Sequence, residues 1–553
     1  MTDLYKSKAF TWALLLIFTI AWFYMLDLRT LVPTDEGRYA EMAREMVASG
    51  DWITTRLNGI KYFEKPPLQT WMNALTFELF GMGEWQARFW TGLSGFFGIV
   101  MTAYAGYRVF NPRVGFYAGL VLASSWLWAA LGHVNTLDMG LSGMMTLALC
   151  ALLVAQRDNA TASERRTWML ACWAGMALAV MSKGLIGLVL PGAVLVIYTV
   201  LARDWSIWQR LHLGKGLLLF FAITTPWFIL VSLKNPEFPR FFFIHEHFER
   251  FLTKTHHREG PLYYFVPLLV VGLLPWLGVF VQSVVQGMKH DAAARFQPKK
   301  MLVIWAGFIF FFFSISSSKL PSYILPIFPA LALLLAAYLE HAPRRSWIIA
   351  ASLLAALGVV GMALTPKVAT LTKVPQEIPL YQAYQPWVLA AAIVALVGGL
   401  MSLWCLRSLQ TRRDLAVVIL AVSGFASSQI LMLGHEPLGR YASGEPLVAP
   451  ILAELSPDTP LYAVGRYDQA IPYYLRRTMI LVEHTDELEF GLKQQPELWI
   501  PTRAAFIDKW RNGPKSIAVT TPEIYTEMQK QGVPMRIVVQ DPRRIVIAND
   551  PKP

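Results

Sequence analysis

Long apolar segments constrain the fold of this 553-residue chain more than any other feature. About thirteen of them approach the ~20 residues that a helix needs to cross a bilayer. They cover 9–26, 85–107, 112–132, 138–156, 167–182, 184–201, 214–233, 261–284, 301–316, 321–340, 346–364, 386–406 and 414–434. Only 16% of the residues are charged, whereas soluble domains carry about 25%. The sequence therefore predicts a polytopic α-helical membrane protein.

The placement of lysine and arginine predicts how the segments are oriented. If the N-terminus is cytoplasmic, the short loops with several basic residues fall on the cytoplasmic side, at 108–113, 157–166, 203–210, 289–300, 344–345 and 407–413. The short loops on the other side carry few, so the positive-inside rule is satisfied. The formal net charge of +12 is then explained by helix ends and anionic lipid headgroups. We expect no nucleic-acid partner.

Three long segments fall on the non-cytoplasmic side: 27–84, 234–260 and 436–553. The last one alternates β-branched runs with helix-like stretches, which predicts a small α/β domain. The first one shows two stretches with helical apolar periodicity, expected to lie in the membrane interface, with Glu41 and Glu45 as surface residues. We divide the chain into a transmembrane domain over 1–435 and an α/β domain over 436–553.

Two carboxylates at the outer ends of apolar segments are candidates for chemistry. Asp35 follows the first segment, and Asp138 begins the fourth at a similar predicted depth. Either one could simply cap a helix. Carboxylates at membrane depth are nevertheless costly and tend to be functional. We predict that both face one cavity.

Several cations share the same predicted side of the membrane. Lys65 precedes two prolines, whose fixed backbone suits aiming an ammonium at a phosphate. Arg250, in the second long loop, is a natural bidentate phosphate ligand. Lys183 and Lys319 lie at the outer mouth, although Lys319 with Tyr323 could equally be an interfacial anchor pair. Cations beside an interfacial cavity suit a lipid phosphate.

The second long loop also carries histidines. His245 and Glu249 are one helical turn apart, but the spacing is not that of the His-Glu-x-x-His zinc motif. His245 could bind a divalent metal together with a carboxylate from the first loop.

Five motifs occur in an order that resembles a known family. They are 35–41, 62–67, 182–184, 245–250 and 319–326. The chain resembles the GT-C superfamily, in the branch that protein O-mannosyltransferases share with bacterial aminoarabinose transferases. Segments 35–41 and 62–67 are most similar to the aminoarabinose transferases.

This resemblance implies a GT-C fold of about thirteen transmembrane helices with a periplasmic α/β domain, in the bacterial inner membrane. It implies transfer of 4-amino-4-deoxy-L-arabinose from undecaprenyl phosphate to lipid A phosphate at the periplasmic face. It also implies roles for individual residues: catalysis by Asp35 and Asp138; substrate binding by Tyr62, Lys65, Lys183, Arg250, Lys319 and Tyr323; and a metal site at Glu64 and His245. We expect a monomer, with the divalent metal as the one candidate cofactor.

Two alternatives stay open. The same fold could transfer the sugar to protein serine or threonine, in which case Asp35 would act as a true base. A polyprenyl-lipid flippase should instead place ionisable residues at mid-membrane and show inverted repeats. Here the charges gather at one interface and no repeat is evident, which favours the transferase.

Overall fold

A computed structural model describes residues 3–249 and 260–549, and its contacts divide the chain into two compact units. The membrane unit comprises Met1–Leu26, Arg88–Leu371 and Gln382–Gly434. The α/β unit comprises Asp27–Ala87, Thr372–Tyr381 and His435–Pro553. The first long loop, which we assigned to the transmembrane domain, therefore clusters with the C-terminal residues.

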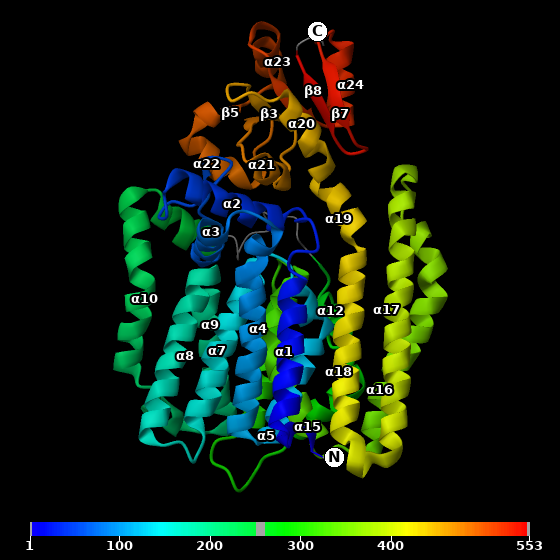
Figure 1. Ribbon diagram of the computed structural model, residues 1–553. Coiled ribbons are helices and arrows are strands. Elements are labelled where there is room, and N and C mark those ends of the chain that lie inside the picture. Colours follow the sequence, from blue (N-terminus) through cyan, green and yellow to red (C-terminus); the bar gives the residue numbers. More distant parts are fainter. Residues whose placement is uncertain (1–2, 250–259, 550–553) are drawn as a thin grey trace. The chain divides into compact units, whose positions relative to one another are not determined.

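A helix or a broken helix pair lies at every predicted apolar segment (Figure 1). The helices are α1 (Lys8–Tyr24), α4 (Glu84–Val109), α5 (Pro112–Ser124), α6 (Trp126–Leu131), α7 (Leu137–Gln156), α8 (Ala162–Lys183), α9 (Ile186–Ala202), α10 (Leu213–Lys234), α12 (Phe265–Gly272), α13 (Phe280–Gly287), α14 (Pro298–Ile315), α15 (Phe328–Leu339), α16 (Arg344–Leu364), α17 (Ile378–Cys405) and α18 (Leu409–Gly434).

Within the described residues, seven helices are both long and apolar enough to span a membrane. The number becomes eight if the pair Phe265–Gly272 and Trp276–Gly287, bent by 102°, forms one span. Helices α1 and α9 are apolar but have 17 residues each. Several spans are thus confirmed as helices, while the total of about thirteen crossings stays a prediction.

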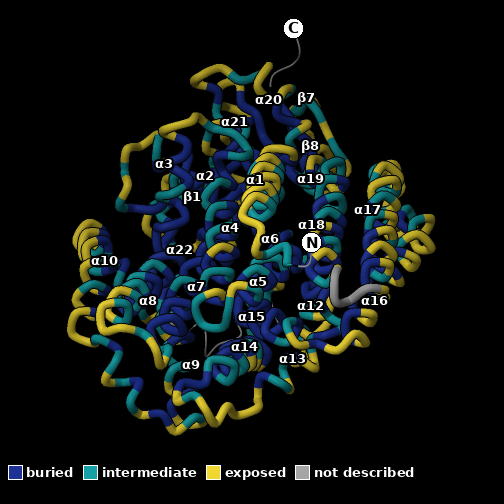
Figure 2. The backbone as a smooth tube through the Cα atoms, turned by 60° about the horizontal axis from the view of Figure 1, so that its bottom comes forward, coloured by how far each residue is buried: buried dark blue, intermediate teal, exposed yellow. Residues whose placement is uncertain are grey.

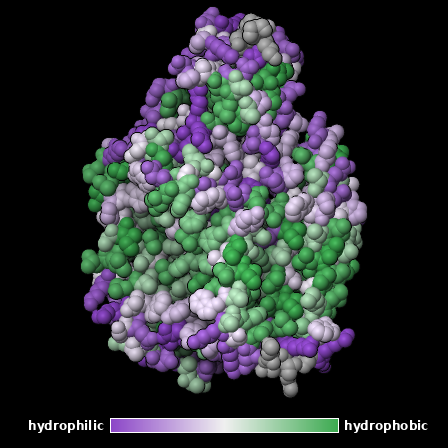
Figure 3. Space-filling view, viewed as in Figure 1, coloured by the Kyte–Doolittle hydropathy of each residue, from purple (hydrophilic) through white to green (hydrophobic). Residues whose placement is uncertain are grey.

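Helix α7 forms the centre of the membrane unit, since nearly all of its residues are buried. It packs closely on α8 through small residues: a Cβ atom added to Gly175 would come within 2.7 Å of the Ala148 backbone nitrogen. Such contacts are typical of membrane helices, which associate by close packing rather than by the hydrophobic effect. Exposed apolar side chains concentrate instead on outer helices such as α10, α16 and α17 (Figures 2 and 3).

The C-terminal part of the α/β unit is a six-stranded sheet of order β5-β4-β3-β6-β8-β7. Its strands are β3 (Leu461–Val464), β4 (Ile480–Val482), β5 (Trp499–Ile500), β6 (Ile517–Thr520), β7 (Arg536–Gln540) and β8 (Ile545–Ala548). The strands β5, β4, β3 and β6 are parallel, whereas β8 pairs antiparallel with both β6 and β7. Helices α21 (Ala470–Leu475), α22 (Glu489–Gln494), α23 (Arg503–Asn512) and α24 (Pro522–Lys530) connect them. The α/β prediction is confirmed.

The first long loop forms α2 (Asp35–Ser49), the hairpin β1 (Arg56–Leu57) and β2 (Ile60–Lys61), and α3 (Leu68–Phe80). Gly50 ends α2 with a φ of 67°, as the helix C-terminus requires. The expectation that Glu41 and Glu45 lie on the surface is wrong, because their exposed fractions are 0% and 7%. They are buried because α2 packs against both α3 and α21, and Arg44 donates hydrogen bonds to both carboxylate oxygens of Glu41.

Candidate functional site

A buried polar cluster surrounds Asp138, in the first turn of α7. Lys183 Nζ, at the end of α8, donates a hydrogen bond to Asp138 Oδ1, and Ser322 Oγ donates to Oδ2 over 2.8 Å. Asp138 is only 6% exposed. Both carboxylate oxygens therefore have a partner, which offsets the cost of burying the charge.

Local structure explains why these groups face each other. Lys183 ends α8, because Gly184 follows with a φ of 84°, whereas Asp138 begins α7. A cation at a helix C-terminus and an anion at a helix N-terminus are both favoured by the helix dipole. Ser322 lies in the 3₁₀ turn Pro321–Ile327.

Tyr323 extends this cluster, and Lys319 belongs to the same motif, 319–326. The Lys183 ammonium lies 4.3 Å from the centroid of the Tyr323 ring, a cation–π contact. Lys319 is buried, and its Nζ donates to the Ser316 carbonyl over 2.6 Å. The structure thus brings together Asp138, Lys183 and Tyr323. Ser322, which the sequence analysis did not single out, lies within the motif 319–326.

A second cluster lies in the α/β unit, at the start of α2. Asp35 Oδ1 is 3.4 Å from Arg38 Nη1, one turn along the helix. Arg38 Nη2 is 2.7 Å from Glu487 Oε2. The Arg38 side chain is almost fully buried, while that of Asp35 is 39% exposed. Asp35 is therefore accessible to a ligand and is held beside a fixed cation.

Two residues of this cluster were not predicted from the sequence: Arg38, which pairs with Asp35, and Glu487, which pairs with Arg38. Arg38 could have been found, because an acid and a base three residues apart on a helix are neighbours. Glu487 carries no sequence signal, since it comes from a distant part of the chain. Burial raises the pKa of Glu487 to about 7, although the neighbouring Arg38 opposes that shift.

Tyr62, Glu64 and Lys65 lie in the same unit. Tyr62 is buried, which raises its pKa well above the usual value, and within residues 3–249 and 260–549 its hydroxyl has no hydrogen-bond partner. Lys65 Nζ donates to the Glu64 carbonyl over 2.8 Å and lies 4.0 Å from Glu64 Oε2. A lysine cation therefore neighbours the carboxylate that the resemblance assigns to a metal.

Two predicted residues cannot be placed in this way. Arg250 lies outside the described residues. His245 lies in the π-helical segment Arg240–Glu249, but its side chain is outside the described part. Among the residues that are described, no three His, Cys, Asp or Glu side chains gather to hold a metal. Asp35 and Asp138 belong to different units, so a shared cavity stays a prediction.

Comparisons with known proteins cover nearly the whole chain. A family model described as dolichyl-phosphate-mannose-protein mannosyltransferase matches residues 64–230, and one described as aminoarabinose transferase C-terminal domain matches 447–549. The crystal structure of ArnT from Cupriavidus metallidurans bound to undecaprenyl phosphate is 42% identical and covers 98% of both chains, with a TM-score of 0.93. Its apo state gives a TM-score of 0.92.

Curated relatives agree with this match. Two of them, from Edwardsiella ictaluri and Proteus mirabilis, are named undecaprenyl phosphate-alpha-4-amino-4-deoxy-L-arabinose arabinosyl transferase. The protein from Edwardsiella ictaluri is 32% identical over 61% of this chain, which spans 60% of that relative's length. The relative from Proteus mirabilis, whose name carries the number 2, is 30% identical over 71% of each chain.

The many-helix membrane unit, the α/β unit and these matches define a GT-C glycosyltransferase of the inner membrane, with several membrane-spanning helices. Within that class, the chain belongs to the aminoarabinose transferase family.

Proposed function

We propose that this protein transfers 4-amino-4-deoxy-L-arabinose from undecaprenyl phosphate to a phosphate of lipid A, with inversion at the sugar carbon. The similarity to the undecaprenyl phosphate-bound structure, over 98% of the chain, carries this proposal. The names of the curated relatives supply the sugar and its carrier. The protein acts as a monomer in the bacterial inner membrane.

The α/β unit faces the periplasm in this proposal. Support comes from the basic residues at one end of the helices, because Arg108 lies in the last turn of α4, Arg113 in the first turn of α5, and Arg157 directly after α7. The positive-inside rule puts these ends of the helices in the cytoplasm. Asp138 lies at the other end of α7 and therefore on the periplasmic side.

The chemistry requires charge stabilisation more than proton transfer. The leaving group is a lipid phosphate, and Lys65 and Arg250 stabilise the charge that develops on it. An acceptor phosphate is already ionised, so it needs no strong general base. Asp35, with its accessible carboxylate, positions the sugar and balances the positive charge of the amino group. Attack from the face opposite the leaving phosphate gives inversion.

The Asp138 cluster has a supporting role in this reaction. Both oxygens of Asp138 already accept hydrogen bonds, so the carboxylate holds Lys183 in place rather than removing a proton. Lys183, Lys319 and Tyr323 then contribute to binding the substrate, and Tyr62 does so from the first loop. A divalent ion held by Glu64 and His245 stays a prediction, and the proposed reaction does not depend on it.

The test compares two acceptors. Purified protein in lipid nanodiscs is supplied with undecaprenyl-phosphate aminoarabinose and with either lipid A or a serine-containing peptide. We expect sugar on lipid A alone. Transfer to the peptide would instead support a protein acceptor, as the mannosyltransferase match over 64–230 allows. Absence of transfer to either acceptor, from protein with a normal unfolding temperature, would refute the proposed reaction.

A further inference from the structure

A cavity of about 630 Å³ lies at the end of the membrane unit remote from Asp138. Helix α7 has 20 residues, so its two ends are about 30 Å apart. Asp138 lies at the first end, and Arg157, which follows the second end, lines the cavity. The remaining walls come from the end of α4 and the segment that joins α13 to α14. The cavity is therefore separate from the cluster around Asp138.

Two of the four cations in this cavity have an acidic neighbour and two do not: Glu164 pairs with Arg108 and lies near Arg157, whereas within the described residues Lys289 and Lys299 form no ion pair. Arg108, Arg157, Lys289 and Lys299 line the cavity. Arg157 Nη2 is buried and, in the described part of the chain, makes no hydrogen bond; it lies 3.6 Å from Glu164 Oε1. Burial and then the charge of Arg108 lower the pKa of Arg157. The lowered pKa indicates that the neighbouring acid does not fully balance the charge of the Arg157 guanidinium.

The two acids that line the cavity, Asp158 and Asp291, are oriented by backbone hydrogen bonds and form no ion pair with Lys289 or Lys299. Asp158 accepts hydrogen bonds from the backbone N–H groups of Arg295 and Phe296, at 2.9 and 3.3 Å. Asp291 accepts one from the Ala293 N–H at 3.0 Å. For Lys289 and Lys299, residues 3–249 and 260–549 provide no acidic partner within ion-pair distance. An anionic ligand would therefore meet two lysines, Lys289 and Lys299, that form no ion pair in this part of the chain.

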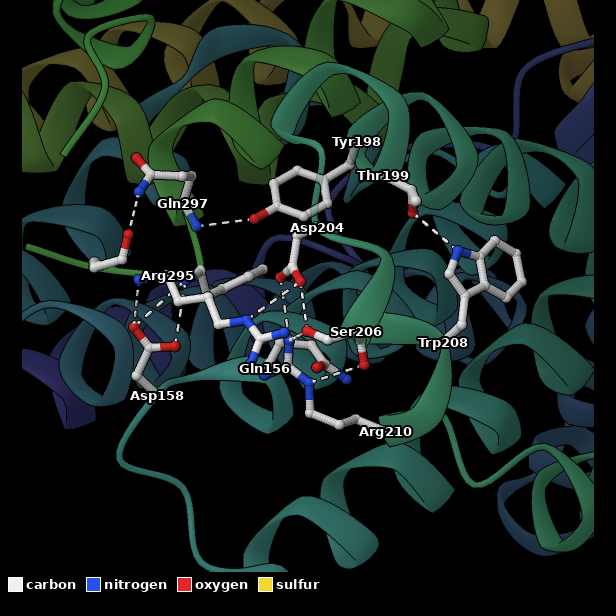
Figure 4. Close-up of polar contacts among 12 residues, drawn as sticks. Gln156, Asp158, Tyr198, Thr199, Asp204, Ser206, Trp208, Arg210, Arg295 and Gln297 are labelled. Carbon is white, nitrogen blue, oxygen red and sulfur yellow. Dashed lines mark hydrogen bonds and ion pairs between the residues drawn. The ribbon is translucent and has the colours of Figure 1, made fainter. Parts of the chain in front are cut away.

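The wall between α13 and α14 is held in a defined conformation (Figure 4). The Gln297 side chain donates to the carbonyls of Asp291 and Ala294, at 2.7 and 2.5 Å. The Gln297 backbone N–H donates to the Tyr198 hydroxyl at 2.9 Å. A wall ordered by its own hydrogen bonds lowers the entropy cost of binding a ligand.

An apolar stripe leads along α13 to the cavity. Val281, Val285 and Met288 are 64%, 54% and 59% exposed, and their spacing places them on one helix face. The next residue, Lys289, lines the cavity. Apolar side chains that end at a cation match the acyl chain and headgroup of a lipid, whereas a soluble anion would gain nothing from the stripe.

We propose that this cavity binds the phosphate headgroup of an anionic phospholipid, with an acyl chain along α13. The positive-inside rule explains why basic residues occur at this end. The rule does not require these residues to gather around a cavity. Nor does it require the Arg157 guanidinium to be buried with one nitrogen that makes no hydrogen bond. Basic pockets between transmembrane helices bind such headgroups in other proteins. The assignment of this lipid to the cytoplasmic leaflet rests on the proposed orientation of the protein, and the rest of the proposal does not.

The experiment measures lipid binding and not sugar transfer. Full-length protein in detergent is titrated with phosphatidylglycerol or phosphatidylcholine, and bound lipid is counted by native mass spectrometry. The test variant is Lys289→Gln with Lys299→Gln. The control, Arg344→Gln with Arg345→Gln, removes two exposed charges that do not line the cavity. Unfolding temperatures of both variants establish that the fold is retained.

We expect wild-type protein to prefer phosphatidylglycerol. Each lysine should contribute roughly fivefold to the affinity, so the test variant should bind phosphatidylglycerol about 25-fold more weakly than the wild type. The affinity of the control variant should be unchanged. Equal binding of the two lipids, or equal loss in both variants, would overturn the proposal. Competition by sn-glycerol 3-phosphate as strong as that by the lipid would show a site for soluble phosphates, and would overturn the lipid assignment. Because transfer is not the readout, failure here leaves the proposed reaction untouched.

Discussion

Lys183 and Asp138 form a buried ion pair that joins the last turn of α8 to the first turn of α7. The two residues belong to a helix pair with close backbone packing in the centre of the membrane unit. Removing either partner leaves the other charge buried without compensation. The pair therefore couples the stability of the bundle to the geometry of the candidate site.

Lys183→Met should destabilise the protein by roughly 3 kcal/mol, the cost of leaving a buried charge unpaired. Lys183→Met combined with Asp138→Asn should be more stable than the single variant, because no charge is then left. Neither variant should transfer sugar. Thermal unfolding in detergent and the transfer assay measure the two effects. A single variant as stable as the wild type would contradict the structural role of the pair.

Asp35→Asn and Lys65→Ala should each abolish transfer in a membrane assay while the chain stays folded. The reason is that Asp35 positions the sugar and Lys65 stabilises the leaving phosphate. Glu78→Gln, on the exposed face of α3, and Lys61→Ala, on β2, are matched controls from the same loop. Sugar transfer at the wild-type rate by either test variant would rule out the proposed role of the substituted residue.

Glu45 should make the protein less stable as the pH rises. Burial, followed by the nearby charge of Glu41, raises the pKa of Glu45 to about 8 from 4.5. When a carboxyl has a higher pKa in the folded protein than in the unfolded chain, the folded state holds its proton more tightly. Below the pKa of the unfolded chain this contribution to stability is complete, and it is lost as the pH rises towards the pKa of the folded protein. The unfolding temperature should therefore fall between pH 4.5 and pH 8.

Glu45→Gln isolates this effect, since an amide oxygen can still accept the Gly59 N–H hydrogen bond. The variant should raise the unfolding temperature at pH 8 by on the order of 5 °C and leave it unchanged at pH 4.5. An unchanged pH dependence in the variant would assign the effect to another group, such as Glu487.

Gly175→Ala should destabilise the membrane unit by about 1–3 kcal/mol, as overpacking does. The added Cβ would approach the Ala148 backbone nitrogen to 2.7 Å, and backbone cannot move aside cheaply. Gly192→Ala in α9 is the control, because no atom lies within 4 Å of its Cβ position. That control should be neutral or slightly stabilising, since alanine favours helix. Equal unfolding temperatures for the two variants would refute the packing argument.

The sequence by itself determined the helices of the membrane unit, the two helices of the first loop and the α/β nature of the C-terminal part. Those features follow from the length and periodicity of the apolar segments, which are local signals. It also singled out Asp138, Lys183 and Tyr323, because ionisable and aromatic residues at the ends of apolar segments are conspicuous.

Only the tertiary structure decided which of these residues meet. Asp138 pairs with Lys183, 45 residues away, and with Ser322, 184 residues away, and Arg38 pairs with the distant Glu487. Periodicity shows which face of a helix is apolar but not which neighbour covers it, so Glu41 and Glu45 were expected at the surface and are buried. Pairing across such separations depends on how the helices pack, and that information is not local.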